Sequence, residues 1–384
     1  MTRIALLGAT GSIGTQTLEI IRLHREQLEV VALTAQSNVE KLIALCAEFS
    51  PRIAVIADKQ YYPQLKDALK GTNTQACCAE EGLLEAATMP EADLVLSSLV
   101  GFAGFLPTLK AIEQGKTIAL ANKEVLVAGG ECITAAAHKH GARLIPVDSE
   151  HSAIYQCLLG ETSPVEKIWL TASGGPFLHK SREEMASVTP EKALNHPRWL
   201  MGPKVTIDSS TLANKGFEAI EAHYLFGVPM TQIQVVVHPE SIVHSMVEFC
   251  DGSVKAQLSL PDMRLPISLA LGVGKRLPNA FPRLNFFDQT LHFLAPDFDK
   301  FPLLRFAYEA MEQGGNTPAI LNAADSVAVE AFLRKQIPFT AIPEIAKEML
   351  SRSYYSADAS MVSILETDRL VCEACRRYIF EKYR

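Results

Sequence analysis

The sequence predicts an α/β protein that begins with a doubly wound parallel sheet and ends in a four-helix bundle. Three observations support this fold class. Short apolar runs alternate with helix-length segments over residues 1–148, apolar runs with a hairpin signal fill the middle, and helical patterns end the chain. A length of 384 residues suits two or three domains, and a hydrophobic content of 48% is enough for a sizeable core.

The N-terminal sheet is predicted from apolar runs that are each short enough for a buried strand. Longer helix-like stretches separate these runs. Because parallel strands need crossover helices, the alternation predicts a Rossmann-like parallel sheet over residues 1–148. The predicted strands are 3–8, 30–34, 53–57, 93–97, 117–120 and 143–147, and the first predicted helix covers 12–25.

The rest of the chain changes character twice. Apolar runs and an Asp251-Gly252 hairpin signal predict a central α/β domain with a partly antiparallel sheet over 149–274, which is the catalytic domain if the chain is an enzyme. A stretch rich in Pro, Asn, Asp and Phe predicts a linker over 275–298, and helical patterns predict a C-terminal helical domain over 299–384. The predicted strands are 167–172, 205–207, 233–237, 243–249 and 254–260, and the predicted helices are 152–159, 211–226, 302–313, 317–335, 340–351 and 358–383.

Charge and cysteine content exclude several classes of protein. Lys and Arg number 36 against 43 Asp and Glu, and the net charge of −7 has the wrong sign for a dedicated nucleic-acid binder. The most apolar run, 94–109, is shorter than the roughly 20 residues of a membrane span, and the N-terminal residues lack the pattern from which a signal peptide would be predicted. Eight cysteines are too sparse for a disulfide scaffold, and Cys372 and Cys375 lack a second ligand pair for zinc. We therefore expect a cytoplasmic protein that binds neither nucleic acid nor membrane.

A glycine-rich loop, Gly8-Ala-Thr-Gly-Ser-Ile-Gly14, follows the first strand and opens the first helix. In that context glycines allow the backbone to approach a pyrophosphate, and the helix N-terminus offers free N–H groups to it. The loop predicts a dinucleotide site, although a plain glycine-rich turn would have the same composition. The second predicted strand is followed by Gln36-Ser37-Asn38, without the acidic residue that usually holds the ribose 2′-hydroxyl of NADH. That absence favours NADPH, whose 2′-phosphate an acid would repel.

Two acidic segments are candidates for a metal site. Asp148 and Glu150 follow the last strand of the N-terminal sheet, and α/β sites form at the carboxyl ends of parallel strands. Glu218 and Glu221 share one face of a predicted helix, so either could be a third carboxylate. A loop that caps a helix would explain the first segment equally well, and a solvent-exposed helix face would explain the second. Lys123 follows a strand at the same edge of the sheet and could face a substrate carbonyl or phosphate.

Polar segments in the middle of the chain are candidates for phosphate and substrate binding. The run 209–215 places hydroxyls, an amide and an ammonium at a predicted strand-to-helix junction, a suitable set for an anion. Ser173-Gly-Gly after a strand can bind phosphate through backbone amides. The irregular segment 176–202 is predicted to be a flap that carries His196 and Trp199. Lone residues of these two types are more often structural.

Together these motifs resemble the 1-deoxy-D-xylulose 5-phosphate reductoisomerase family over essentially the whole chain. The resemblance implies a homodimeric, NADP-dependent oxidoreductase of isoprene biosynthesis. Such an enzyme converts 1-deoxy-D-xylulose 5-phosphate to 2-C-methyl-D-erythritol 4-phosphate with NADPH and Mg²⁺ or Mn²⁺, and Co²⁺ can also serve. The resemblance rests on Gly-Ala-Thr-Gly-Ser-Ile-Gly at 8–14, Ala-Asn-Lys-Glu at 121–124, Pro-Val-Asp-Ser-Glu-His at 146–151, Ser-Gly-Gly-Pro-Phe at 173–177, His-Pro-Arg-Trp-Leu-Met-Gly at 196–202 and Asn-Lys-Gly-Phe-Glu at 214–218.

The resemblance also implies roles for individual residues of this chain. The implied metal ligands are Asp148, Glu150 and Glu218, because the family motif selects Glu218 over Glu221. The implied catalytic residues are Lys123, Glu150 and His196. The implied substrate-binding residues are Lys123, Ser149, Glu150, Ser173, His196, Trp199, Ser209, Asn214, Lys215 and Glu218. The implied NADPH-binding residues are Thr10, Gly11, Ser12, Ile13, Gln36, Ser37, Asn38, Asn122, Glu124 and Gly202.

One departure from the family pattern affects the choice of cofactor. Family members often carry Gly-Lys-Asn where Gln36-Ser37-Asn38 stands here. The missing lysine weakens the expected selection of the 2′-phosphate but leaves the hydride chemistry unchanged. We therefore expect NADPH to be preferred over NADH by a smaller margin.

Two other functions fit parts of the pattern. An aspartate-semialdehyde dehydrogenase also opens with a Gly-Ala-Thr-Gly loop, but it needs a nucleophilic cysteine. The candidates, Cys132 and Cys157, lie in no matching motif. A nucleotide-sensing binding protein would need neither the three carboxylates nor the phosphate-binding residues. Thiol alkylation and turnover of 1-deoxy-D-xylulose 5-phosphate separate these alternatives from the main prediction.

Overall fold

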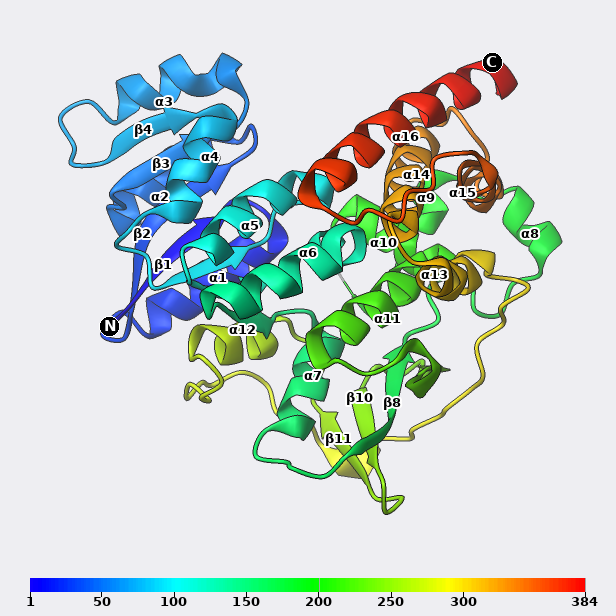
Figure 1. Ribbon diagram of the computed structural model, residues 1–384. Coiled ribbons are helices and arrows are strands. Elements are labelled where there is room, and N and C mark those ends of the chain that lie inside the picture. Colours follow the sequence, from blue (N-terminus) through cyan, green and yellow to red (C-terminus); the bar gives the residue numbers. More distant parts are fainter. Residues whose placement is uncertain (200, 384) are drawn as a thin grey trace. The chain divides into compact units, whose positions relative to one another are not determined.

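The computed structural model describes residues 1–199 and 201–383; residue 200, within the predicted flap, lies outside the described residues. The chain forms two compact units (Figure 1). The first unit contains Met1–Val125, Ile133–Ser152 and Asp262–Phe281, and the second contains Leu126–Cys132, Ala153–Pro261 and the described chain from Pro282 onward. The helices α6 (Glu124–His140) and α7 (Ser149–Leu158) have residues in both units.

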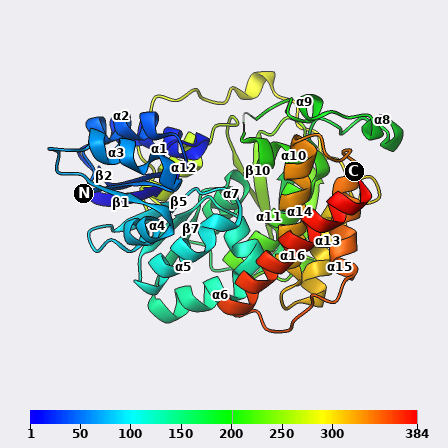
Figure 2. The same cartoon turned by 90° about the horizontal axis from the view of Figure 1, so that it is seen from above.

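A seven-stranded parallel sheet forms the centre of the first unit. Its strands are β1 (Thr2–Leu7), β2 (Leu28–Ala35), β3 (Ile53–Ile56), β4 (Gln75–Cys78), β5 (Leu94–Ser97), β6 (Thr117–Leu120) and β7 (Arg143–Pro146), in the order β4-β3-β2-β1-β5-β6-β7. Its helices are α1 (Ser12–Leu23), α2 (Val39–Phe49), α3 (Tyr62–Ala68), α4 (Ala79–Thr88), α5 (Phe105–Glu113) and α12 (Arg264–Leu271), with the 3-10 turns η1 (Lys59–Tyr61) and η2 (Gly101–Gly104). Figure 2 shows α1, α2, α3 and α12 on one face of the sheet and α4 and α5 on the other.

Burial on both faces explains why this sheet could be predicted from the sequence. Since helices cover both faces, β3 and β5 are buried at every position and read as continuous apolar runs. The predicted strands are confirmed to within two residues at their ends. The edge strand β4 was not predicted, because its Gln-Ala-Cys-Cys sequence is short, with one exposed and three half-buried residues.

A segment from later in the sequence completes the first unit. α12 packs against α1, where Arg264 forms a 3.6 Å ion pair with Glu19. The guanidinium of Arg264 also lies 4.2 Å from the centre of the Phe281 ring. The predicted domain limits, 149–274 and 275–298, cut through this segment. Local composition does not indicate that residues 262–281 pack back onto the N-terminal unit.

The second unit is built on a mixed four-stranded sheet. Its strands are β8 (Val165–Ala172), β9 (Ile233–Val237), β10 (Val243–Phe249) and β11 (Val254–Leu258), in the order β11-β10-β8-β9. Only the β8–β9 pair is parallel, so the predicted partly antiparallel sheet is confirmed. The helices are α8 (Arg182–Ala186), α9 (Pro190–Ala193), α10 (Pro203–Thr211), α11 (Ala213–Phe226), α13 (Pro302–Gln313), α14 (Thr317–Leu333), α15 (Ala341–Ser351) and α16 (Met361–Lys382), with the 3-10 turns η3 (Met230–Gln232) and η4 (Phe286–Asp288).

The C-terminal helices share one core with this sheet. α14 is buried along most of its length, and α13, α15 and α16 pack around it (Figure 1). The ring of Phe177, which follows β8, lies 5.2 Å from the ring of Phe339, and Phe332 lies 5.5 Å from the same ring. The four predicted helices are confirmed, but the chain from residue 299 lies in the same compact unit as the sheet. No described helix is both long and apolar enough to cross a membrane.

The segment 205–207, predicted to be a strand, is helical instead. It lies in α10, which begins at Pro203 directly after Gly202 and is followed by Leu212 in the left-handed conformation (φ +57°). The prediction was wrong because a run of three residues, Val-Thr-Ile, fits a short strand and a buried helical turn equally well. Pro203 is the signal that favours a helix, since proline suits the first helical position.

Candidate active site

The glycine-rich loop joins β1 to α1 at the boundary between β1 and β5, where the sheet's strand order changes direction. Gly8 adopts a φ of +94°, and a Cβ there would lie 2.7 Å from the carbonyl oxygen of Ser98. Its N–H donates to Thr34 Oγ1 at 2.9 Å, which holds the loop against β2. α1 begins after Gly11, which has no side chain to cap the N–H groups of the first turn. This helix N-terminus suits a pyrophosphate.

The predicted ribose-binding turn lies next to this loop. Gln36, Ser37 and Asn38 are exposed after β2. The backbone N–H of Ala9 donates to the Thr34 carbonyl at 2.7 Å, so the glycine loop and the end of β2 are tied together. The turn and the loop therefore lie at one edge of the sheet, as a dinucleotide site requires.

Asn122 and Glu124 lie after β6 in the first unit. Asn122 Nδ2 donates to the Glu124 carboxylate at 2.6 Å and to the Gly101 carbonyl at 3.0 Å. Gly104 packs so closely that a Cβ there would overlap Asn122 Oδ1. These contacts hold the Asn122 amide in one orientation.

Lys123 and Asp148 form a nearly buried ion pair in the first unit. Lys123 Nζ lies 2.6 Å from Asp148 Oδ2, and His151 Nδ1 lies 3.9 Å from Asp148 Oδ1. Burial opposes ionisation of Asp148, but Lys123 and His151 outweigh it and hold the pKa of this carboxyl well below its usual range. Ser149 donates to the Glu150 carboxylate at 2.5 Å. The first unit thus carries an ionised carboxylate two residues from a second, and such hard oxygen ligands suit a divalent cation.

In the second unit, His196 joins two predicted phosphate-binding serines. Its Nε2 lies 3.1 Å from Ser173 Oγ and 3.1 Å from Ser209 Oγ. Its Nδ1 accepts the backbone N–H groups of Arg198 and Trp199 at 3.2 and 2.9 Å. Burial lowers the pKa of His196 to about 4, so the ring is neutral near pH 7. Because Nδ1 is an acceptor, the proton lies on Nε2, which is then a donor.

The junction of α10 and α11 carries the other predicted phosphate-binding residues. Leu212 turns the chain between the two helices with a φ of +57°. Lys215 and Glu218 are both buried, and Lys215 Nζ lies 2.5 Å from the Glu218 carboxylate. Asn214 donates to the same carboxylate. Glu221, the alternative carboxylate, lies about one turn further along the helix and is also buried.

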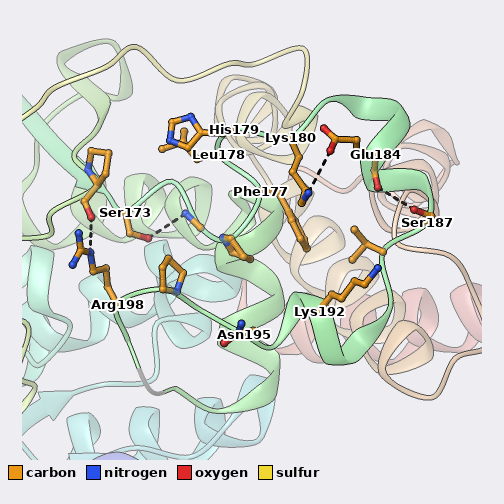
Figure 3. Close-up of a pocket in the computed structure, with 15 residues that line it drawn as sticks. Ser173, Phe177, Leu178, His179, Lys180, Glu184, Ser187, Lys192, Asn195 and Arg198 are labelled. Carbon is orange, nitrogen blue, oxygen red and sulfur yellow. Dashed lines mark hydrogen bonds and ion pairs between the residues drawn. The ribbon is translucent and has the colours of Figure 1, made fainter.

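The predicted flap, 176–202, borders a cavity of about 850 Å³ that reaches Ser173 (Figure 3). The charged residues that line this cavity are Lys180, Glu184, Lys192 and Arg198. Lys180 pairs with Glu184 at 3.4 Å, so Lys192 and Arg198 leave the lining with a net positive charge. Positive charge beside Ser173 favours an anionic ligand.

One contact of the flap was not predicted from the sequence. The ring of Trp199 lies 6.0 Å from the ring of His244, a buried residue of β10, in an edge-to-face arrangement. Burial lowers the pKa of His244 to about 4. The sequence around His244 reads as an ordinary strand, and only the fold brings this ring next to the flap.

We expect the flap to loosen in acid, because His196 must be neutral to accept two N–H groups. Its folded pKa of about 4 lies below the value of about 6.5 for an exposed histidine. The stability that the neutral ring contributes is therefore complete above about pH 6.5 and is lost as the pH falls towards 4. Fluorescence of Trp199, measured in a Trp169→Phe background, should change over this range. A His196→Gln variant should lack the change; a change that persists would assign it to His244.

Three family models match the chain in order. They are described as 1-deoxy-D-xylulose 5-phosphate reductoisomerase at residues 4–130, the C-terminal domain of this reductoisomerase at 144–226, and a DXP reductoisomerase C-terminal domain at 258–374. The 1-deoxy-D-xylulose 5-phosphate reductoisomerase of Clostridium perfringens is 48% identical over 387 residues, which cover 100% of both chains. That of Porphyromonas gingivalis is 51% identical over 365 residues, which cover 95% of both. The chain belongs to the 1-deoxy-D-xylulose 5-phosphate reductoisomerase family.

Solved structures of the reductoisomerase family share the whole fold. A crystal structure of DOX-P reductoisomerase in complex with NADPH, fosmidomycin and magnesium aligns with a TM-score of 0.94 at 42% identity and covers 100% of both chains. The reductoisomerase of Zymomonas mobilis in complex with NADPH aligns with a TM-score of 0.91 at 42% identity, covering 98% of this chain and 99% of that one. The resemblance drawn from the six sequence segments is confirmed.

The reductoisomerase family leaves no role for the cysteine nucleophile of a semialdehyde dehydrogenase. Burial raises the pKa of the Cys157 thiol to about 11, so little thiolate exists near pH 7. Cys132 lies within α6, away from any strand-to-helix turn. The alternative function therefore finds no support in either candidate.

Proposed function

We infer that this chain catalyses the NADPH- and divalent-metal-dependent rearrangement and reduction of 1-deoxy-D-xylulose 5-phosphate to 2-C-methyl-D-erythritol 4-phosphate, in isoprenoid precursor biosynthesis. The observation that carries this function is the full-length match to reductoisomerases at about half identical residues. The dinucleotide loop, the ionised Asp148 and the His196 network supply the chemistry that this reaction needs.

The first unit fits NADPH, which supplies the hydride when it is bound. The uncapped N-terminus of α1 suits the pyrophosphate, and the turn after β2 lacks a carboxylate that would repel a 2′-phosphate. We assign the contacts with NADPH to Thr10, Gly11, Ser12, Ile13, Gln36, Ser37, Asn38, Asn122, Glu124 and Gly202.

We propose that Asp148, Glu150 and Glu218 coordinate one divalent cation, Mg²⁺ or Mn²⁺, with Co²⁺ as a further candidate. The donor chemistry fits, because all three offer carboxylate oxygens, and the pKa of Asp148 is held far below neutrality. When bound, the cation would draw electron density from the substrate oxygens as a Lewis acid. Lys123 Nζ, held 2.6 Å from Asp148, would orient this carboxylate.

We propose that Ser173, Ser209, Asn214 and Lys215 bind the substrate phosphate, with His196 beside them. The support is that Nε2–H of His196 already faces both serine hydroxyls, and that Lys215 is a buried cation on the adjacent helix. Each of these groups donates a hydrogen bond, as a phosphate requires.

The reacting end of the substrate is assigned to Lys123, Ser149 and Glu150. The ammonium of Lys123 is a preorganised positive charge that stabilises negative charge developing on a substrate oxygen. Trp199 is held through its backbone N–H by His196 Nδ1, so phosphate binding at His196 is coupled to the position of the flap. A closed flap keeps water from the reactive aldehyde.

The direct test of this function is turnover with purified substrate. The protein should oxidise NADPH, followed by its near-ultraviolet absorbance, only when 1-deoxy-D-xylulose 5-phosphate and Mn²⁺ or Mg²⁺ are both present. A metal chelator should stop the reaction, and fosmidomycin, which occupies a solved relative, should inhibit it. The absence of turnover under these conditions would reject the proposal.

Two glycine variants separate folding from cofactor binding in the glycine loop. A Cβ at Gly14 would lie 2.7 Å from the Ala9 backbone, so Gly14→Ala should lower stability by roughly 1–3 kcal/mol. A Cβ at Gly11 would meet the Gly8 carbonyl oxygen at 3.5 Å, an ordinary contact, so Gly11→Ala should fold normally. Because Gly11 borders the helix N-terminus, that variant should instead weaken NADPH binding. Thermal unfolding without cofactor and NADPH titration would measure the two effects.

We also propose a homodimer that works in the cytoplasm. The turn η4 and the chain that follows it expose apolar side chains, with Phe287 of η4 99% exposed and Phe293 and Leu294 about half exposed. Leu294 pairs with Val237 of the edge strand β9, so this apolar segment extends the sheet of the second unit. Free thiols at all eight cysteines are typical of a reducing compartment. Analytical ultracentrifugation of the wild type and a Phe287→Ser variant would test the dimer.

A further inference from the structure

We propose that Lys41 binds the 2′-phosphate of NADPH and thereby sets the preference of this enzyme for NADPH over NADH. The proposal rests on the NADPH dependence inferred above. It assigns a cation to a site whose turn, Gln36-Ser37-Asn38, contains none. Lys41 was not predicted from the sequence, because it lies three positions beyond this turn and inside a helix.

The first turn of α2 directs Lys41 back towards the glycine loop. Asn38 is the N-cap of α2, and its Oδ1 accepts the backbone N–H of Lys41 at 3.1 Å. Helical side chains lean towards the N-terminus of their helix, so the Lys41 side chain runs towards the edge of the sheet. Its Nζ donates to the Thr10 carbonyl at 3.1 Å and to Thr15 Oγ1 at 2.8 Å.

The charge of Lys41 is not neutralised by these contacts. Both acceptors are neutral oxygens, so these two contacts bring no negative charge to the half-buried Lys41 side chain. A cation in the first turn of a helix also opposes the helix dipole, which favours anions there. A residue that breaks a local rule in this way is expected at functional sites.

The position of Lys41 matches the position of a ribose 2′-substituent. In this class of sheet the pyrophosphate lies at the first glycine loop, and the adenosine ribose lies at the end of the second strand. Thr34, near the end of β2, accepts N–H groups of both Gly8 and Ala9, so loop and strand end are adjacent. Lys41 Nζ is anchored on Thr10 in that same loop. A phosphate on the ribose, with its roughly two negative charges, would therefore meet this ammonium.

A structural alternative gives a different experimental result. If Lys41 only connects α2 to the glycine loop, its loss would loosen that loop and weaken NADPH and NADH to the same extent. If Lys41 binds the 2′-phosphate, its loss would weaken NADPH alone. The ratio of the two affinities therefore separates the two roles.

The experiment measures both cofactors on the full-length protein. Dissociation constants for NADPH and NADH are determined by calorimetry without substrate, and kcat/KM is measured with 1-deoxy-D-xylulose 5-phosphate. Lys41→Gln should weaken NADPH about 10- to 100-fold, the value of one charge-assisted hydrogen bond, and leave NADH within about twofold. Lys41→Arg should restore most of the preference. Lys59→Gln is the matched control, because Lys59 is an exposed lysine in the turn after the neighbouring strand β3.

Each outcome bears on one proposal. Equal losses for both cofactors in Lys41→Gln would overturn the 2′-phosphate role, and so would an unchanged NADPH affinity. A selective loss in Lys59→Gln as well would replace the specific contact with a general effect of surface charge. Failure of the wild type to turn over with either cofactor would instead count against the proposed reaction, since the binding measurements do not require turnover.

Discussion

Replacement of Asp148 by Asn is expected to lower kcat/KM with Mg²⁺ or Mn²⁺ on the order of 10³-fold or more. The amide keeps the size of the side chain but loses the charge that the structure maintains by holding the pKa of Asp148 well below its usual range. It also removes the partner of Lys123, which now lies 2.6 Å away. Steady-state kinetics over a cation titration would measure the loss, and more cation should not restore the rate.

The matched control for this variant is Asp93→Asn. Asp93 also pairs with a cation, Arg3, at 2.8 Å, but it is partly exposed and lies at the other end of β5 from the site. Exposed ion pairs contribute little to stability, so this variant should keep near wild-type kinetics. Near wild-type turnover of Asp148→Asn itself, with normal cation dependence, would remove Asp148 from the ligand set.

The sequence predicted those parts of the fold that depend on local patterning. β1 to β3 and β5 to β7 contain buried apolar runs, and α13 begins with Pro302 and ends before Gly314, so strand burial and helix-end signals located them. Packing between distant segments could not be predicted from local sequence patterns. The docking of α12 on α1, through Arg264 and Glu19, depends on contacts between residues far apart in the chain. The same holds for the shared core of Phe177 and Phe339.

In the candidate site too, local motifs could be predicted from the sequence and long-range contacts could not. The sequence grouped Asn214, Lys215 and Glu218 because they lie in one continuous motif, and the structure places all three on one helix, α11. Contacts between segments far apart in the chain could not be predicted. His244 meets Trp199 from the middle of a strand, and Lys41 meets the glycine loop from another helix. In both cases the surrounding sequence looks structural, and only the fold gives the side chain a functional neighbour.

Replacement of Lys215 by Met is expected to raise the substrate KM by 100-fold or more and to destabilise the protein as well. Lys215 and Glu218 are both buried and lie 2.5 Å apart. Removing one member of a buried pair leaves the other charge without compensation, at a cost of roughly 3–5 kcal/mol. The phosphate loses a charge-assisted hydrogen bond in addition. Denaturant unfolding measures the first effect, and substrate titration at saturating NADPH measures the second.

Lys204→Met separates these two effects, because Lys204 has the same structural role without the proposed phosphate contact. Its Nζ lies 2.5 Å from Asp208 and 2.6 Å from Asp325, both buried, so its loss should destabilise the second unit by a similar amount. Its substrate KM should nevertheless stay within about threefold of the wild type, since a folded chain retains every proposed phosphate donor. A raised KM in Lys215→Met alone would assign the phosphate to Lys215. Equal changes in the two variants would show that KM follows the stability of the α10–α11 region instead.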